Sequence, residues 1–303
     1  MSNPLQAYII VGPTASGKSA VAQLLAEQTG ASLVSADSMN IYRGMDIGTA
    51  KPSPADRRNV PTFGIDLADP TETFSVGNWL NAVKPVFFHC LDSPTIVAGG
   101  TGLYVKCLLA GLDDLPPADE ELRERAEKMT LAELQAEAKA AAPEAYEALA
   151  DKENPRRIIR LIEKSQGVKK NHTCAGGVGL DLPKIIGLHV ERAVLHKRIA
   201  ARVDQMYAGG LIEEARGLAE IQLSSTAQHA IGYAEAFAVL RGEMSEADAK
   251  EKTVVRTRRL AKRQMTWFRN QLNVEWIETA DVPTIGKLAE KVFNVWTPVP
   301  VAL

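Results

Sequence analysis

The chain has 303 residues, of which 46% are hydrophobic and 24% charged, so it can form one large domain or two modest ones. Its formal net charge is −2, so the total charge does not predict nucleic-acid binding. Its three cysteines lack the CxxC spacing of a zinc site. No stretch approaches the roughly 18 apolar residues of a membrane span, and the N-terminus lacks a signal-peptide pattern, so we expect a cytoplasmic protein without a membrane partner.

The N-terminal third of the chain alternates short apolar strands with helices. Strands are predicted at residues 7–11, 33–36 and 95–98, and helices at 19–28 and 79–90. This alternation predicts an α/β fold, in which a parallel sheet is flanked by helices. Ligands of such sheets bind where strands end and helices begin.

The middle of the chain shows no strand pattern over residues 119–150, which are rich in Ala and Glu. Leu115–Pro117 precedes this stretch as a boundary, and Asn154–Pro155 opens another helix. Residues 176–179, Gly-Gly-Val-Gly, suggest an exposed loop, and residues 184–190 return to a strand. We therefore predict a P-loop catalytic core in two parts, 1–115 and 185–303, around a helical insertion domain, 116–184.

The C-terminal part is predicted to be mostly helical, with one long helix that begins at Ser245 and ends near residue 272. Charge is unevenly distributed along the chain. Residues 113–153 hold 13 acidic and 5 basic side chains. Residues 156–172 hold 1 acidic and 6 basic side chains, and residues 251–272 hold 1 acidic and 7 basic side chains. The basic runs suit either solvated helix faces or contact with a polyanion, and both interpretations stay open at this point.

The strongest motif is an octapeptide that follows the first strand and opens the first helix. It matches G-x-x-x-x-G-K-[ST] in the context that a phosphate-binding loop requires, which disfavours a chance glycine-rich turn. Its backbone N–H groups and the helix N-terminus would surround phosphate oxygens, while Lys18 supplies a positive charge and Ser19 can ligate Mg²⁺. The motif consists of Gly12, Pro13, Thr14, Ala15, Ser16, Gly17, Lys18 and Ser19.

The ends of the other two strands differ in their chemistry. Strand 95–98 ends in Gly-Gly-Thr, without the acid that holds the metal in ATP-hydrolysing enzymes, which counts against ATP hydrolysis. Strand 33–36 is followed by Asp37, which could position Mg²⁺ or act as a general base. The alternative is that Asp37 caps the next helix.

Beyond these features, the chain resembles the tRNA dimethylallyltransferases (tRNA isopentenyltransferases, the IPP transferase family) along nearly its full length. The resemblance rests on residues 37–52 (DSMNIYRGMDIGTAKP), 99–104 (GGTGLY), 154–157 (NPRR) and 262–269 (KRQMTWFR). Because no Cys or His pairs occur near the C-terminus, a bacterial or organellar type is implied. The family transfers a dimethylallyl group from dimethylallyl diphosphate, with Mg²⁺, to N6 of the adenosine just 3′ of the anticodon of certain tRNAs, and releases diphosphate.

By resemblance, Asp37 is the general base, Thr101 lies near the transferred group, and Arg202 contacts the diphosphate, although Arg198 lies one helical turn away. We expect Phe268 to pack in the core and the enzyme to be a monomer. The residues that the resemblance places against tRNA are Asp37, Ser38, Met39, Asn40, Thr101, Arg123, Arg156, Arg157, Arg160, Gln228, His229, Ile231, Gly232, Lys262, Arg263, Gln264, Trp267 and Arg269.

Three other functions fit these residues less well. A small-molecule or nucleotide kinase is disfavoured by the missing acid after strand 95–98 and by the basic helix near the C-terminus. An enzyme that prenylates free adenine nucleotides would need neither the insertion nor that helix. A non-catalytic RNA-binding module would not need Asp37 and Thr101 beside an intact phosphate loop.

Overall fold

The structure is a computed structural model, and it describes residues 7–57, 59–89, 93–112, 119–166, 184–280, 282 and 284–297. The chain divides into two compact units, Met1–Ala110 with Gly177–Leu303, and Gly111–Gly176. In the described part of the chain, no helix is both long and apolar enough to cross a lipid bilayer.

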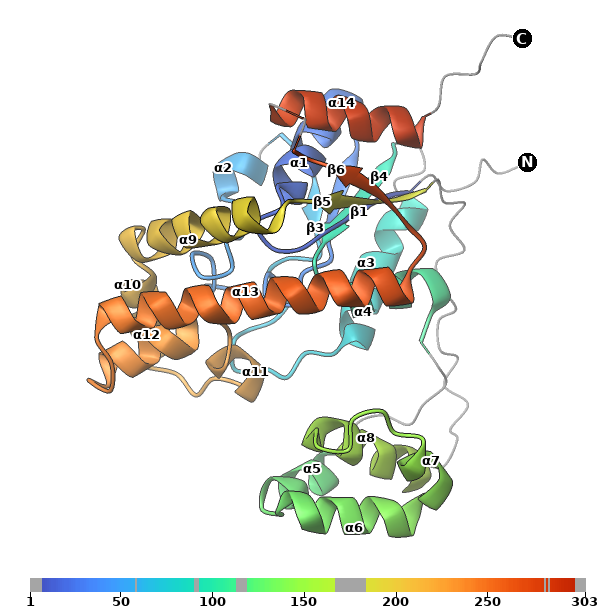
Figure 1. The fold of residues 1–303 in the computed structure, drawn as a ribbon, viewed down its shortest axis with the longest axis vertical. Helices are drawn as coiled ribbons and strands as arrows, with labels where there is room; N and C mark the ends of the chain where they lie inside the picture. Colours follow the sequence, from blue (N-terminus) through green and yellow to red (C-terminus); the bar gives the residue numbers. More distant parts are fainter. Residues whose placement is uncertain are drawn as a thin grey trace. The chain divides into compact units, whose positions relative to one another are not determined.

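The larger unit contains one sheet whose strands are all parallel (Figure 1). Its order is β3-β2-β4-β1-β5-β6. The strands are β1 (Ala7–Val11), β2 (Ser32–Ser35), β3 (Thr62–Phe63), β4 (Thr95–Gly99), β5 (Ile185–His189) and β6 (Val274–Glu278). A parallel sheet flanked by helices confirms the predicted α/β fold class.

The central strands are apolar on both faces because helices cover both sides of a parallel sheet. Ile9, Ile10 and Val11 of β1 are almost fully buried, and β1 pairs with β4 from Ala7 opposite Thr95 to Val11 opposite Gly99. The register brings the ends of these two strands level with each other, so the loops that follow them start side by side.

Helices α1 (Lys18–Thr29) and α14 (Ile285–Trp296) pack together and share a core with the sheet. Helices α3 (Val76–His89) and α4 (Gly102–Ala110) pack against each other, and the ring of Trp79 stacks on that of Tyr104 at 4.6 Å between centroids. The helix predicted from residue 79 therefore begins three residues earlier. Figure 1 shows the first pair of helices on one side of the sheet and the second pair on the other.

The remaining helices of the larger unit include the short α2 (Pro54–Arg57), and most follow β5. They are α9 (Arg192–Ala208), α10 (Leu211–Leu218), α11 (Ser225–Gln228), α12 (Tyr233–Leu240) and α13 (Glu246–Gln271). Helix α13 is the long helix predicted from Ser245, and the hydroxyl of Ser245 accepts a hydrogen bond from the Asp248 amide, 3.1 Å away, as its cap. It packs against α9, α12 and α4.

The smaller unit is helical in its described residues and has its own core. Its helices are α5 (Glu120–Glu127), α6 (Leu131–Ala141), α7 (Pro143–Glu147) and α8 (Pro155–Gln166). Leu122, Leu134, Tyr146, Ile158 and Ile162 are among the side chains that fill the core. The boundary predicted at 115–117 and the glycine loop predicted at 176–179 lie outside the described residues.

Candidate active site

The carboxyl ends of β1, β4 and β2, which are neighbours in the sheet, bring three predicted segments together. β1 leads into the phosphate loop, β2 into Asp37 and β4 into Thr101. The last two segments are bonded directly, because the Ser38 amide donates to Oγ1 of Thr101 at 3.0 Å and the Thr101 amide donates to the carbonyl of Ala36 at 3.0 Å. The structure therefore places Asp37 and Thr101 side by side, next to the phosphate loop.

The phosphate loop is a tight turn with left-handed backbone at two positions. Gly17, at the start of α1, has φ of 92°, and Ala15 has φ of 63°. The Ser16 amide donates to the carbonyl of Pro13 at 3.2 Å. The hydroxyl of Ser16 is buried and has no hydrogen-bond partner among the described residues. A buried hydroxyl without a partner is unfavourable, so this one marks a place where a polar ligand would be accommodated.

Lys18 is buried, and its Nζ donates to the carbonyl of Pro13 at 3.3 Å. Burial lowers the pKa of Lys18 to about 8, the negative charge of Asp37 opposes that shift, and the positive charge of Arg202 adds to it. Burial also lowers the pKa of Arg202, again against the influence of Asp37. These three charged groups therefore lie close enough to act on one another at the mouth of the phosphate loop.

Both candidate arginines of α9 reach this region. Nη2 of Arg202 donates to the carbonyl of Thr49 at 3.2 Å, and Nη1 of Arg198 donates to the carbonyl of Ser16 at 3.5 Å. Arg202 is therefore bonded to the segment that follows Asp37, and Arg198 to the phosphate loop itself.

The carboxylate of Asp37 closes a local turn, since its Oδ1 accepts from the Met39 amide at 3.0 Å. The chain after Asp37 continues as turns, and the next described helix, α2, begins only at Pro54. The alternative interpretation, a helix cap at Asp37, is therefore not what the structure has. Asn40, three residues on, is buried and its Nδ2 donates to Oγ of Ser35 at 3.4 Å.

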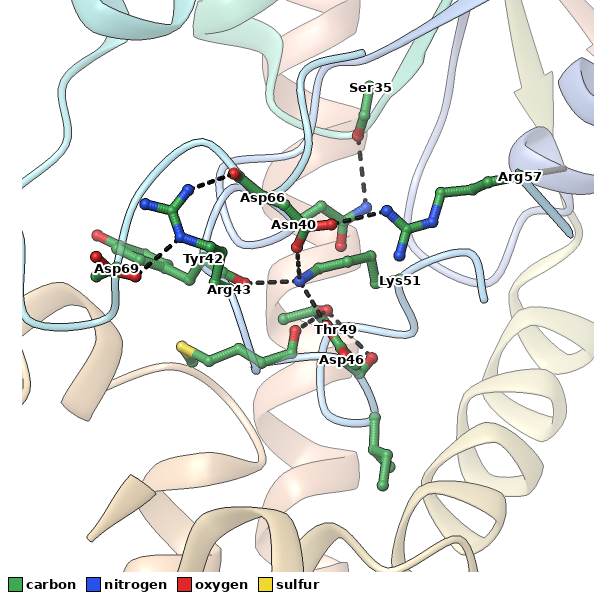
Figure 2. Close-up of polar contacts among 12 residues, drawn as sticks. Ser35, Asn40, Tyr42, Arg43, Asp46, Thr49, Lys51, Arg57, Asp66 and Asp69 are labelled. Atoms are coloured by element: carbon green, nitrogen blue, oxygen red, sulfur yellow. Dashed lines mark hydrogen bonds and ion pairs between the residues drawn. The ribbon is translucent and has the colours of Figure 1, made fainter. Parts of the chain in front are cut away.

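A buried ammonium group organises the segment that follows Asp37 (Figure 2). Nζ of Lys51 donates to the carbonyl of Tyr42 at 2.6 Å, to Asp46 at 2.6 Å and to Asp66 at 2.7 Å. Burial opposes the ionisation of Asp66, but hydrogen bonds from Lys51 and Arg57 outweigh it and hold the pKa of Asp66 below its usual range. No role was predicted for Lys51, because no motif marks the partner 15 residues away.

Comparison with known proteins agrees with this geometry. A family model described as IPP transferase matches residues 40–271, and one described as isopentenyl transferase matches residues 5–61. The tRNA dimethylallyltransferase of Geobacter sulfurreducens is 39% identical over 301 residues, which cover 94% of this chain and 96% of that relative. The chain belongs to the IPP transferase family.

Solved structures support the same conclusion. The crystal structure of the full-length tRNA isopentenylpyrophosphate transferase from Bacillus halodurans is 35% identical, with a TM-score of 0.69 over 96% of this chain and 97% of that one. A eukaryotic dimethylallyltransferase acting on tRNA shares the fold at 20% identity, with a TM-score of 0.76 over 95% of this chain and 78% of that one. The resemblance noted in the sequence is thus confirmed, and the roles of individual residues remain predictions.

In this IPP transferase, α13 presents exposed cations on one face and closes the site with another. Lys262, Arg263 and Arg269 are exposed, while Phe268 is fully buried, as predicted. Trp267 is half-buried and meets the ring of Phe268 edge-on at 5.5 Å between centroids. An open groove of about 540 Å³ runs along the exposed face, with Lys262, Arg263 and Trp267 among its lining residues.

Gln264 does not share that exposed face. Its Oε1 accepts from the amide of Thr14 at 2.9 Å, and its Nε2 donates to the carbonyl of Gly100 at 3.1 Å. The side chain that was expected to contact tRNA is thus bonded to two loops of the same chain.

The predicted contact segment around residues 228–232 forms the turn between α11 and α12. Gln228 and His229 are exposed, Ile231 is half-buried and Gly232 is buried. The described hydrogen bonds of this turn run to nearby residues of α11 and α12 and to Arg256 of α13, which donates to the carbonyl of His229 at 2.9 Å, and none of them reaches the phosphate loop.

The arginines predicted in the smaller unit fall into two kinds. Arg156 and Arg157 are exposed at the start of α8. Arg123 and Arg160 each donate to the buried carboxylate of Glu163 at 2.7 Å, so part of their charge is neutralised within the unit. Burial opposes the ionisation of Glu163, and the hydrogen bonds from these arginines outweigh it and lower its pKa.

Proposed function

We propose that this enzyme transfers a dimethylallyl group from dimethylallyl diphosphate to N6 of the adenosine that follows the anticodon of a tRNA. The observation that carries the proposal is the cluster of Lys18, Asp37 and Arg202, with Thr101 bonded beside it, at the ends of adjacent strands. Membership of the IPP transferase family supports prenyl transfer as the reaction and tRNA as the acceptor.

The phosphate loop is suited to hold the diphosphate of the donor. Ala15 and Gly17 have the left-handed backbone that such turns need, and the N-terminus of α1 adds its partial positive charge. Lys18 adds a full charge, and the unpartnered hydroxyl of Ser16 would find a phosphate oxygen there. Stabilising the charge that develops on the leaving group is the largest catalytic contribution expected of such a site.

The protein oxygens near the phosphate loop could hold Mg²⁺ only together with the phosphate oxygens of the substrate. In the described part of the chain, no group of three or more His, Cys, Asp or Glu side chains could hold a metal ion. Mg²⁺ usually keeps waters and takes one or two protein oxygens plus phosphate oxygens. Ser19, exposed at the start of α1, would supply the protein oxygen, and the bound ion would neutralise charge on the diphosphate.

The chemical step needs a base, because the exocyclic amine of adenine is a weak nucleophile. Asp37 would take a proton from N6 as the nitrogen forms a bond to the first carbon of the dimethylallyl group. The bond from that carbon to the bridging oxygen breaks, and diphosphate leaves with the electron pair toward Lys18 and Arg202. Thr101, bonded to Ser38 next to Asp37, would lie beside that bridging oxygen.

The tRNA would be held mainly through its phosphates. Exposed cations are available for this on α13, Lys262 and Arg263, and, in the smaller unit, on α8, Arg156 and Arg157. The target adenosine must leave the stacked anticodon loop to reach Asp37, at an unstacking cost of a few kcal/mol. We infer that the enzyme works as a monomer in the cytoplasm.

The deciding experiment incubates purified enzyme and unmodified tRNA with radiolabelled dimethylallyl diphosphate and Mg²⁺, without ATP. Label should appear in the tRNA and, after digestion, on a single modified adenosine. A matched reaction with tRNA that is already modified at that position should incorporate none. Incorporation that requires ATP, or that occurs equally into free adenine nucleotides, would contradict the proposal.

A further inference from the structure

The side chain of Gln264 joins two loops that lie far from it in the sequence. Oε1 accepts from the amide of Thr14, in the phosphate loop, at 2.9 Å, and Nε2 donates to the carbonyl of Gly100, at the end of β4, at 3.1 Å. One carboxamide therefore sets the spacing between the loop that would hold the diphosphate and the turn that carries Thr101.

The turn around Thr101 leaves no room between itself and α13. A Cβ on Gly100 would lie 2.4 Å from Nε2 of Gln264, and a Cβ on Gly102 would lie 2.0 Å from the ring of Trp267. Both distances are far below van der Waals contact, so a side chain at Gly100 would have to displace the carboxamide of Gln264, and one at Gly102 would have to displace the ring of Trp267. A small shift of α13 would therefore change the position of the turn that carries Thr101.

The bond to Thr14 also constrains the phosphate loop. Inward-pointing amides are what make such a loop an anion site, so its shape decides how well it holds a diphosphate. Gln264 occupies the Thr14 amide and fixes the first half of the loop, in which the Ser16 amide turns back to Pro13. Ala15, between them, packs against a core that includes Ala261 of α13.

The same stretch of α13 carries the cations proposed to hold tRNA. Lys262 and Arg263 immediately precede Gln264 and are exposed, whereas Gln264 is half-buried. The helix runs through 26 residues without an interior proline or glycine, so these positions move together. Helix α13 is thus a single rigid element that would contact RNA on one face and is bonded to the two loops on another.

We propose that Gln264 is a positioning residue that couples tRNA binding on α13 to the geometry of the phosphate loop and of Thr101. The inference rests on the proposed function, because it takes the loop as the diphosphate site and α13 as a tRNA surface. Through this coupling, the enzyme would bind the diphosphate most tightly when tRNA is present. Such coupling is reciprocal and in proteins is typically about 5- to 150-fold in affinity.

The test measures the Kd of inorganic diphosphate with Mg²⁺, by calorimetry, in the presence and absence of a saturating anticodon stem-loop RNA. For the wild-type enzyme, the RNA should tighten diphosphate binding by about five-fold or more. For Gln264→Leu, the ratio of the two Kd values should fall to about one. The Kd of the RNA alone should stay within about two-fold, because the exposed cations are unchanged.

The control variant is Gln23→Leu on α1, which removes an amide that donates to the carbonyl of Asp56 at 2.9 Å in an exposed position. It should keep the wild-type ratio. Should Gln264→Leu fail to fold, Gln264→Glu serves in its place, since its carboxylate can accept from Thr14 but cannot donate to Gly100, and the ratio should again fall.

Each result separates the inference from the function on which it rests. A wild-type ratio in a folded Gln264 variant, or no coupling in the wild-type enzyme, would overturn the role of Gln264 while leaving prenyl transfer intact. Absence of transfer in the labelled-donor assay would instead overturn the proposed function, whatever the binding ratio.

Discussion

The ammonium of Lys51 lies 2.7 Å from the carboxylate of Asp66, and its side chain is completely buried. The same group holds Asp46 and the carbonyl of Tyr42, so it ties together the segment that runs from Asp37 to β3. The amide of Asp66 donates in turn to the carbonyl of Asn40 at 3.1 Å. The position of the chain just after the proposed base therefore depends on one buried cation.

We expect Lys51→Met to destabilise the protein by about 3 kcal/mol, because it leaves the partly buried Asp66 without its main partner. The measurement is urea unfolding followed by tryptophan fluorescence. In the double variant Lys51→Met with Asp66→Asn, part of the loss should be recovered, since Asp66 no longer carries the charge that Lys51 had balanced. Equal stability of the wild type and Lys51→Met would show that the network does not hold the segment.

The activity of the enzyme should fall on the alkaline side as Lys18 loses its proton. Burial lowers the pKa of Lys18 to about 8 in the free enzyme, and a bound diphosphate would raise it by favouring the ammonium. Below pH 8 the charged form is present and binding is strongest. Above it, kcat/KM for dimethylallyl diphosphate should fall by up to about ten-fold per pH unit, because this parameter reports groups of the free enzyme.

Two controls identify Lys18 as the source of that fall. The Kd of the RNA alone should not change over the same pH range, since the proposed RNA contacts are arginines and exposed lysines. A Lys18→Arg variant keeps its charge at all these pH values, so whatever activity it retains should lack the alkaline fall. A wild-type profile that stays flat to about pH 9.5 would rule out the shifted pKa.

Removal of the carboxylate at Asp37 should affect the rate much more than tRNA binding. General-base catalysis contributes about 10²- to 10⁴-fold, so Asp37→Ala should lower kcat by that range while the Kd of tRNA stays within a few-fold. Asp37→Asn is the matched control, because its amide oxygen can still accept from the Met39 amide and keep the turn. If Asp37→Asn has a normal kcat, the loss of rate in Asp37→Ala comes from the loss of the local turn and not from the loss of a general base.

Local patterns in the sequence were enough to predict the fold class and the segments that meet in the candidate site. The phosphate loop, Asp37 and Thr101 each follow a short apolar strand, and parallel strands bring such ends together. Strands β3 and β6 were missed because both lie at the edges of the sheet, where β3 has two residues and Ile277 is the one buried residue of β6.

Contacts between distant parts of the chain could not be predicted in the same way. Gln264 was expected to face tRNA, yet its partners lie 250 and 164 residues away. Arg123 carries a charge that suits RNA, but only the fold shows that Glu163 takes part of it. In each case the residue type was informative and its partner was set by packing that no local pattern records.

The exposed cations of α13 make the salt dependence of tRNA binding a direct test of the RNA surface. Lys262→Ala combined with Arg263→Ala should weaken tRNA binding and reduce the slope of log Kd against log salt by about 2, roughly 1 for each phosphate that the protein no longer neutralises. Binding of inorganic diphosphate in the absence of RNA should hardly change, because neither side chain bonds to the phosphate loop among the described residues.

The matched control removes two exposed lysines of α14, Lys287 and Lys291, from the other side of the sheet. This double variant changes the net charge by the same amount. If both double variants reduce the salt slope equally, the attraction comes from the overall charge of the protein. A reduction confined to the α13 variant assigns the phosphate contacts to that helix, since screening acts on local pairs and not on net charge alone.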